Sequence, residues 1–254
     1  MKQHLAFFLL PLAAFLIAGC ADEAATPPQD VPGEGSAFAQ EGEGYDSDAE
    51  ALAKFGGPIS YKITLENLSP QTGAGSSQPF SPPVIAVHSR KIRLFQIWQR
   101  ASDELRQIAE DAVNGPMVSK LESSSEVLSV TEGTGVILPG QTAEFTVNAE
   151  RGFHRLSIAT MLVNTNDGFT GTSGKLLPLF GRQVIYLRAF DAGTERNTES
   201  EAHIPGPCCG SHNVRVPTDE RIRFHRGITG SGDLDPSVYG WDEPVAKLTI
   251  ERVY

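Results

Sequence analysis

Short segments in which apolar and polar residues alternate are the feature that most constrains this fold. In "YKITLENL", Tyr61, Ile63 and Leu65 fall on one face of an extended chain, and the polar residues between them fall on the other. Many short strands divided by turn residues predict a mainly β protein, built as an antiparallel β-sandwich. Clusters of Gly, Pro, Asn and Asp separate the other segments of this kind, which are "PPVIAVHS", "AEFTVNA", "LSIATMLV", "QVIYLRAF" and "VAKLTIERV".

One segment has the period of a helix instead. In "ASDELRQIAEDAVNG", Leu105, Ile108 and Ala112 recur at helical spacing. Ser102 is suited to cap the first turn, and Gly115 is suited to end the helix. We therefore expect one α-helix inserted among the strands.

The first 20 residues, "MKQHLAFFLLPLAAFLIAGC", have the organisation of an export signal. Lys2 gives a positive start, and the apolar stretch from Leu5 to Ala18 is too short to span a bilayer comfortably. The ending "LIAGC" resembles a bacterial lipobox, in which the peptide is cut before Cys20 and the Cys20 thiol is lipidated. The alternative is an ordinary secretory signal that contains a cysteine. We expect residues 1–19 to be a lipoprotein signal peptide and Cys20 to be the lipidation site.

Residues 20–57 differ from the rest of the chain in composition. From residue 21 to residue 57, nine acidic residues stand against the single Lys54, with scattered Gly, Pro and Ser. Such a segment buries too little apolar surface to offset its ordering entropy, so we expect a disordered acidic stalk. The stalk carries −8 and the signal segment +1, which leaves about −3 of the net charge of −10 for the predicted folded domain, residues 58–254. That domain has no basic field of the kind that binds nucleic acid.

Two adjacent cysteines stand in "GPCCGSH". Cys208 and Cys209 could form a vicinal disulfide, stay reduced, or bind a metal together with His203 and His212. A structural turn is the interpretation that we favour, because neighbouring cysteines rarely make a tetrahedral site without a second, spaced pair.

Two apolar strands run into loops rich in oxygen ligands and glycine. "LSIATMLV" is followed by "NTNDGFTG", which contains Asp167, and "VIYLRAF" is followed by "DAGTE", which contains Asp191 and Glu195. Three carboxylates and backbone carbonyls are ligands that calcium accepts, and Gly193 would let the second loop fold back. The spacing is not that of an EF-hand, and the same residues are also ordinary turn formers.

The order and content of several segments resemble the spondin N-terminal domain family. This family includes domains of the animal matrix proteins F-spondin and mindin and of bacterial exported proteins. The resemblance covers nearly all of residues 59–254. It rests on "YKITLENLS", "PFSPPVIAVHS", "ASDELRQIAEDA", "GVILPGQTAEFTV", "LSIATMLVNTNDGFTG", "FDAGTE" and "VAKLTIERV".

The resemblance implies a C2-like β-sandwich with a calcium ion held by loops at one end. The family's acidic positions fall on Asp167, Asp191 and Glu195. Two departures are Gly168, where the animal domains have tryptophan, and Glu195, where they have aspartate. A third acidic loop, "GSGDLDPSVYGWDEP", could add a ligand or could consist of solvated turn residues; its acidic members include Asp233, Asp235 and Asp242.

Together these features favour a non-enzymatic, lipid-anchored protein of the cell envelope, with a calcium-stabilised domain for adhesion or ligand binding. The expected partners are the membrane, through the lipid anchor, and an unidentified protein or glycan. Ala21 is not the aspartate linked to inner-membrane retention, which favours the outer membrane or the cell surface. The alternative is an exported hydrolase or thiol enzyme that uses Cys208 or Cys209 with His212. No nucleophile, zinc-protease or phosphate-loop motif supports that alternative.

Overall fold

The computed structural model describes residues 57–72 and 77–253. The described residues belong to a single unit of the chain. The expected signal peptide, Cys20 and all but the last residue of the expected stalk lie outside the described residues. Within the described ranges, no helix is long and apolar enough to cross a membrane.

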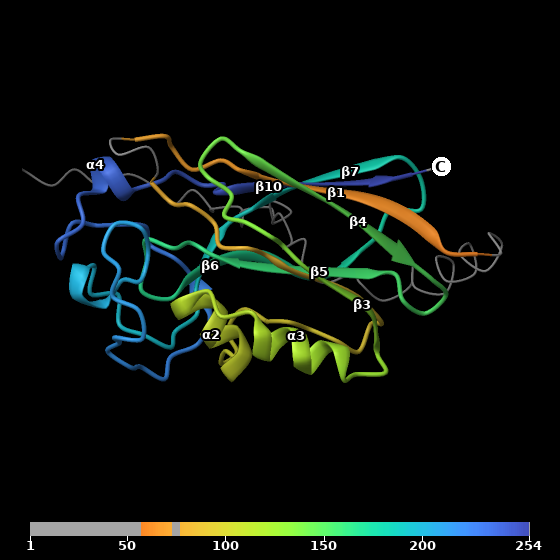
Figure 1. Ribbon diagram of the computed structural model, residues 1–254, viewed down its shortest axis with the longest axis horizontal. Helices are drawn as coiled ribbons and strands as arrows, with labels where there is room; N and C mark the ends of the chain where they lie inside the picture. Colours follow the sequence, from red (N-terminus) through yellow and green to blue (C-terminus); the bar gives the residue numbers. More distant parts are fainter. Residues whose placement is uncertain (1–56, 73–76, 254) are drawn as a thin grey trace, which may run out of the picture. The chain divides into compact units, whose positions relative to one another are not determined.

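Two antiparallel sheets pack face to face in the described part of the chain, which confirms the predicted sandwich (Figure 1). The four-stranded sheet has the order β4 (Thr142–Ala149), β1 (Ile59–Asn67), β10 (Ala246–Arg252) and β7 (Arg182–Leu187). The six-stranded sheet has the order β3 (Val127–Glu132), β2 (Val84–His88), β5 (Arg155–Met161), β6 (Gly168–Leu176), β8 (Ala189–Asp191) and β9 (Arg223–Phe224).

The alternation predicted for the first strand is present in β1. Its odd-numbered residues are buried and its even-numbered residues are partly exposed. Leu65 lies opposite Leu248 of β10, and Ile63 lies opposite Ile250, so the paired strands present apolar side chains to the same face. Each fully buried aliphatic or aromatic side chain contributes about 1.5–3 kcal/mol. The core between the sheets includes Tyr61, Ile63, Leu65, Phe80, Ile85, Leu156, Ile158, Leu162, Leu248 and Ile250.

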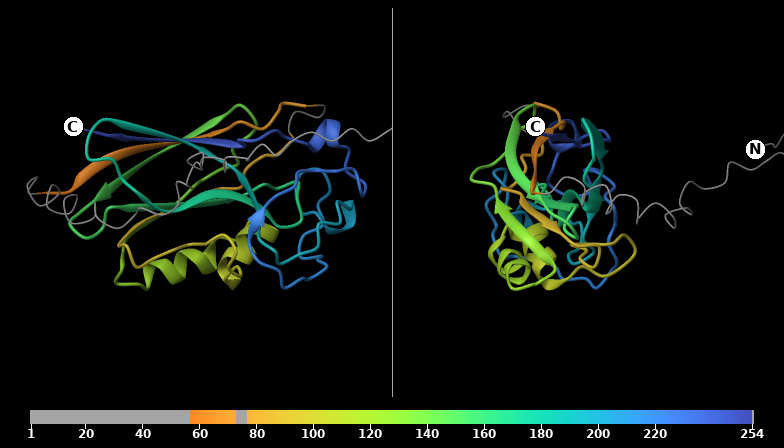
Figure 2. Two further views of the ribbon diagram at one scale, coloured as in Figure 1. Left: turned by 180° about the vertical axis from the view of Figure 1, so that it is seen from behind. Right: turned by 90° about the vertical axis from the view of Figure 1, so that its right-hand side faces the viewer.

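Two short helices cover the outer face of the six-stranded sheet, α2 (Asp103–Asp111) and α3 (Gly115–Glu122) (Figures 1 and 2). The oxygen of Ser102 accepts the backbone N–H of Leu105, as expected for a helix cap. Because helices cover this face, β5 is buried along its whole length.

The prediction of a single helix ending at Gly115 was wrong. Helix α2 ends at Asp111, where Ala112 adopts a left-handed conformation with φ of 57° and its N–H returns to Ile108. Gly115 instead begins α3, and Pro116 follows at the first turn, where a missing N–H costs nothing. Alanine rarely occupies the left-handed region, so the sequence did not signal this break.

Long connections between β8 and β10 form one end of the sandwich (Figure 1). They contain only a 3₁₀ turn, Glu201–His203, the two-residue strand β9 and the one-turn helix α4 (Pro236–Tyr239). Within these connections, Ile204, Ile228 and Leu234 form a small buried apolar cluster. Strand β1 begins at the opposite end of the sandwich and runs toward these loops (Figure 1). At its last residue, Asn67 donates its side-chain N–H groups to Gln78 and Ile137.

Candidate functional site

The sheet brings the two predicted loops together. Asp167 precedes β6, Asp191 ends β8, and these strands pair with Gly168 opposite Asp191. The N–H of Ala192 then donates to the carbonyl of Asp167 at 3.1 Å. Pairing of adjacent strands therefore fixes the separation of the two loops, which are distant in sequence.

Asp167 is fully buried and joins the two loops. Its Oδ2 accepts the backbone N–H groups of Thr194 at 2.8 Å and Glu195 at 3.0 Å. Its Oδ1 is buried and has no hydrogen-bond partner among the described residues. Burial, and next the negative charge of Asp191, raise the pKa of Asp167 to about 7. Oδ2 of Asp167 therefore holds the second loop in place, whereas Oδ1 is available to bind a further ligand.

Asp191 is buried but already paired. Its Oδ1 accepts the N–H of Gly193 at 2.8 Å, and its Oδ2 accepts from Asn197 at 2.6 Å. Arg223 donates through Nε at 3.1 Å and places a second guanidinium nitrogen 3.0 Å from the same Oδ2. Gly193 has a φ of 72°, and a side chain there would collide with the backbone carbon of Glu220. The bend expected at Gly193 is therefore present and needs glycine.

Glu195 is also buried, and its Oε1 accepts hydrogen bonds from Asn166 and from the N–H of Val216, both at 3.2 Å. Burial raises the pKa of Glu195 to about 8, and the charges of Glu110 and Asp167 act in the same direction. These contacts tie Glu195 to both the first loop and the strand-like segment around Val216.

The three predicted ligands are neighbours, but they do not surround one point. In the described part of the chain, no group of three or more His, Cys, Asp or Glu side chains is arranged to hold a metal ion. Arg223 faces Asp191, and Asn166 faces Glu195. One donor suits a hard cation: the buried Oδ1 of Asp167 has no hydrogen-bond partner among the described residues, whereas Arg223 already neutralises Asp191.

Sequence reasoning missed an ion-pair network behind these loops. Glu110 of α2 is 2% exposed and pairs with Arg106 at 2.9 Å and with Arg215 at 2.8 Å. Arg215 also donates to the carbonyl of Thr194 at 2.8 Å, so the helix holds the second loop. Glu110 stands on the buried side of a helix, and that position was the only sequence signal for its role.

Glu199 organises the neighbouring loop. It is buried and accepts both the N–H and the hydroxyl of Thr229 at 2.8 Å and the N–H of Ser231 at 2.9 Å. Burial opposes its ionisation, but these hydrogen bonds outweigh burial and hold the pKa of Glu199 below its usual value. No local sequence pattern indicated this role, because the partners follow about 30 residues later.

Acidic side chains of the third loop accept hydrogen bonds that stabilise a turn and cap a short helix. Asp233 accepts from the hydroxyl of Ser200 at 2.9 Å and from the N–H of Glu201 at 3.1 Å. Asp235 caps α4 by accepting the N–H of Ser237 at 2.8 Å. Asp233, Asp235 and Asp242 are all exposed.

Cys208 and Cys209 are joined in a vicinal disulfide, with an S–S distance of 2.09 Å. Of the three states considered for this pair, the structure therefore has the oxidised one. The N–H of Cys208 donates to the side chain of Asn164 at 3.2 Å, which connects the cysteine turn to the loop of Asp167.

The fold and these loops define a β-sandwich domain with buried carboxylates gathered at one end. The chain belongs to the spondin N-terminal domain family, because the Spondin_N family model matches residues 65–226, more than half of the chain. Membership of this family indicates a spondin-like extracellular domain. A search of curated proteins found no match to the chain.

Proposed function

We propose that this chain is a non-enzymatic, exported binding module of the spondin type. In this proposal, lipid on Cys20 holds it at the cell envelope, preferentially at the outer membrane or cell surface, and calcium stabilises its loop end. The observation that carries the calcium proposal is the free, buried Oδ1 of Asp167. Family membership supports the extracellular setting.

Asp167 and Asp191 are the residues that would hold calcium. Two carboxylates in one buried site repel each other when both are ionised, which is one cause of the raised pKa of Asp167. Bound calcium would add its positive charge to that of Arg223 and would offset this repulsion further. Asp167 would keep the second loop in place through Oδ2, while its Oδ1 would become a ligand. Glu195 fits a supporting role through the hydrogen bonds that it accepts.

Calorimetric titration of the full chain with calcium tests this proposal. A ligand that binds only the folded state stabilises it by about 1.4 kcal/mol at roughly ten times its dissociation constant. For a domain of this size, that corresponds to a rise in melting temperature of about 3–6 °C. We expect both heat of binding and this rise at millimolar calcium, the range of weak extracellular sites.

Asp167→Asn is the informative variant, and Asp235→Asn is the matched control because Asp235 is exposed and caps a separate helix. The Asp167 variant should lose both responses, and the Asp235 variant should keep them. Absence of heat and of a thermal shift in the unaltered chain at 10 mM calcium, chosen from about ten times a weak extracellular dissociation constant, would remove calcium from the function.

The anchor is tested separately from the ion. Cys20→Ser should move the protein from the membrane fraction to the soluble fraction, since lipid on this residue would provide the hold on the membrane. Retention of the Cys20→Ser protein in the membrane fraction would contradict the anchor and would leave the calcium proposal untouched. A protein or glycan ligand at the loop end is the proposed partner, and its capture should then depend on calcium.

A further inference from the structure

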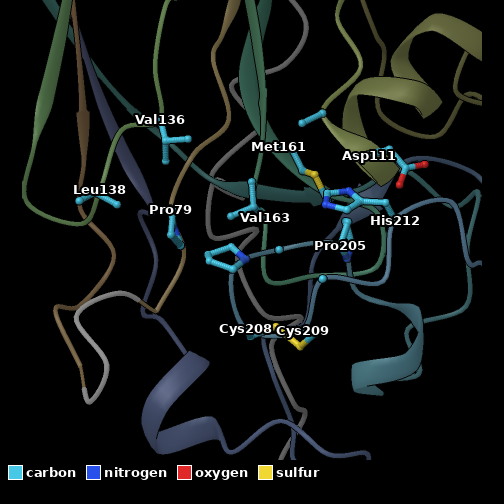
Figure 3. Close-up of a pocket in the computed structure, with 14 residues that line it drawn as sticks. Pro79, Asp111, Val136, Leu138, Met161, Val163, Pro205, Cys208, Cys209 and His212 are labelled. Carbon is cyan, nitrogen blue, oxygen red and sulfur yellow. A yellow bond between two sulfur atoms is a disulfide. The ribbon is translucent and has the colours of Figure 1, made fainter.

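A cavity of about 630 Å³ opens beside the cysteine turn (Figure 3). Its volume is within the range of about 300–1,000 Å³ that is typical of small-molecule sites. Met161, the last residue of β5, and Val163, just beyond it, form one wall, and Pro79 and Pro205 also line the cavity. All four of these side chains are apolar and buried. None of the carboxylates discussed above as calcium ligands lines this cavity.

The wall formed by the Cys208–Cys209 disulfide is held in place by the surrounding backbone. Gly206 accepts the N–H groups of Cys209 at 2.9 Å and Gly210 at 3.0 Å, and Asn164 accepts the N–H of Cys208. A side chain on Gly206 would collide with the carbonyl oxygen of Val163. The turn therefore lies directly against the strand end, and the cavity is already formed without a ligand, which lowers the entropic cost of binding.

The cavity rim exposes two large apolar side chains. Val136 is 52% exposed and Leu138 is 43% exposed, and both line the cavity. Ile137, between them, exchanges two backbone hydrogen bonds with Phe80, at 2.9 and 3.0 Å. The hydrogen bonds between Ile137 and Phe80 thus fix the backbone of the rim. The side chains of Val136 and Leu138 point outward and do not belong to the core.

The charged residues that line the cavity indicate what kind of ligand it can bind. Asp111 is the only acidic residue of the lining, and its Oδ1 accepts the N–H of Asn213 at 2.8 Å. This contact holds the turn that carries His212, whose ring lies beside Met161 in Figure 3. The lining has no Lys or Arg to neutralise an anion, and burying an unpaired charge is costly. The imidazole of His212 provides a hydrogen-bonding group.

We propose that this cavity binds an uncharged, apolar small molecule with one polar group directed to His212. None of its lining residues is a proposed calcium ligand or the proposed lipidation site. The Cys208–Cys209 disulfide would act as a flat, rigid wall against the ligand, and Val136 and Leu138 would cover its outer side.

Two dyes with the same ring system test the preference for an uncharged ligand. N-phenyl-1-naphthylamine is neutral, and 8-anilino-1-naphthalenesulfonate carries a sulfonate. Titrated into the full chain, the neutral dye should show saturable fluorescence with one site per chain. The anionic dye should bind at least about tenfold more weakly, equal to about 1.4 kcal/mol. Equal affinity for the two dyes would overturn the stated ligand class.

A matched pair of variants tests the location. Val136→Asp with Leu138→Asp places charges on the rim, and Val184→Asp with Tyr186→Asp makes the same change at exposed positions of β7. The residues before 57 are common to both proteins, so any dye that they take up is the same in each. The rim variant should lose at least about tenfold in affinity for the neutral dye, again about 1.4 kcal/mol, and the β7 variant should bind as the unaltered chain does. Equal binding by both variants, or no saturable site in the unaltered chain, would refute the proposal.

Discussion

Thr194 donates its backbone N–H to Oδ2 of Asp167 at 2.8 Å, so a buried carboxylate joins two loops that leave adjacent strands of one sheet. Asp167 is therefore both a structural residue and the candidate ligand. This double role makes the stability of the loop end depend on the ionisation of its carboxylates.

The first prediction concerns pH. Folding raises the pKa of Asp167 to about 7 and that of Glu195 to about 8, mainly through burial. A raised pKa stabilises the fold fully below the unfolded pKa, and this stabilisation is lost as pH rises to the folded pKa. In EDTA, the free energy of unfolding should fall by about 1–3 kcal/mol from about pH 6.5 to 8.5. Urea unfolding at several pH values measures this fall, and Glu195→Gln should flatten it.

The contribution of His225 to stability should have the opposite pH dependence. His225 is buried, and desolvation lowers its pKa to about 4. Its contribution to stability is present above the unfolded pKa and is lost as pH falls toward about 4. The carbon-bound ring protons of His225 should keep constant NMR shifts between about pH 5.5 and 8, while an unperturbed histidine titrates near 6.5. A midpoint near 6.5 for His225 would contradict its assigned environment.

Removal of the arginine that neutralises Asp191 should weaken the loop end. Arg223→Gln leaves the buried carboxylate of Asp191 without its cationic partner and should cost about 2–4 kcal/mol. Arg226→Gln, at an exposed position three residues away, is the control and should change stability by less than about 0.5 kcal/mol. Chemical denaturation measures the free energy of unfolding of both variants. Equal losses would show that the Arg223–Asp191 ion pair does not stabilise the fold.

Loss of the ion pairs that Glu110 of α2 makes should also destabilise the fold. Glu110→Gln leaves Arg106 and Arg215 facing a neutral amide in a buried site, with an expected loss of about 2–4 kcal/mol. Asp103→Asn, in the exposed first turn of the same helix, should cost less than about 1 kcal/mol. Because Arg215 also holds Thr194, hydrogen exchange of the second loop should accelerate in the Glu110 variant alone.

The left-handed end of α2 gives a prediction of the opposite sign. Ala112→Gly should stabilise the protein by about 0.5–1 kcal/mol, because glycine reaches a φ of 57° without strain. Ala109→Gly, inside the same helix, should destabilise it by about 1 kcal/mol or more. Thermal unfolding of both variants checks the contrast, and a loss of stability for Ala112→Gly would contradict the assigned backbone conformation.

Local pattern predicted the sandwich well, because the alternation of Tyr61, Ile63 and Leu65 is a direct consequence of burying one face of a strand. It predicted the helix start at Ser102 for the same reason, since capping is local. The end of that helix was missed because Ala112 adopts a left-handed conformation that alanine rarely takes.

The partners of the candidate site could not be read from the sequence. Arg223 follows Asp191 by 32 residues, and Arg215 meets Glu110 across more than 100 residues, so neither pair leaves a local pattern. Strand pairing brings Asp167 and Asp191 together, and the sequence showed only that each follows a strand. The family resemblance supplied the connection between the two loops.

The direction of β1 sets which end of the sandwich is joined to the preceding chain. Its nine residues, Ile59–Asn67, span about 26–30 Å, and the chain joins them at the end of the sandwich away from the loops. In the proposed anchored protein, the stalk would meet the domain at this far pole. Attachment through the stalk would then leave the carboxylate end, at the opposite pole, free for contact.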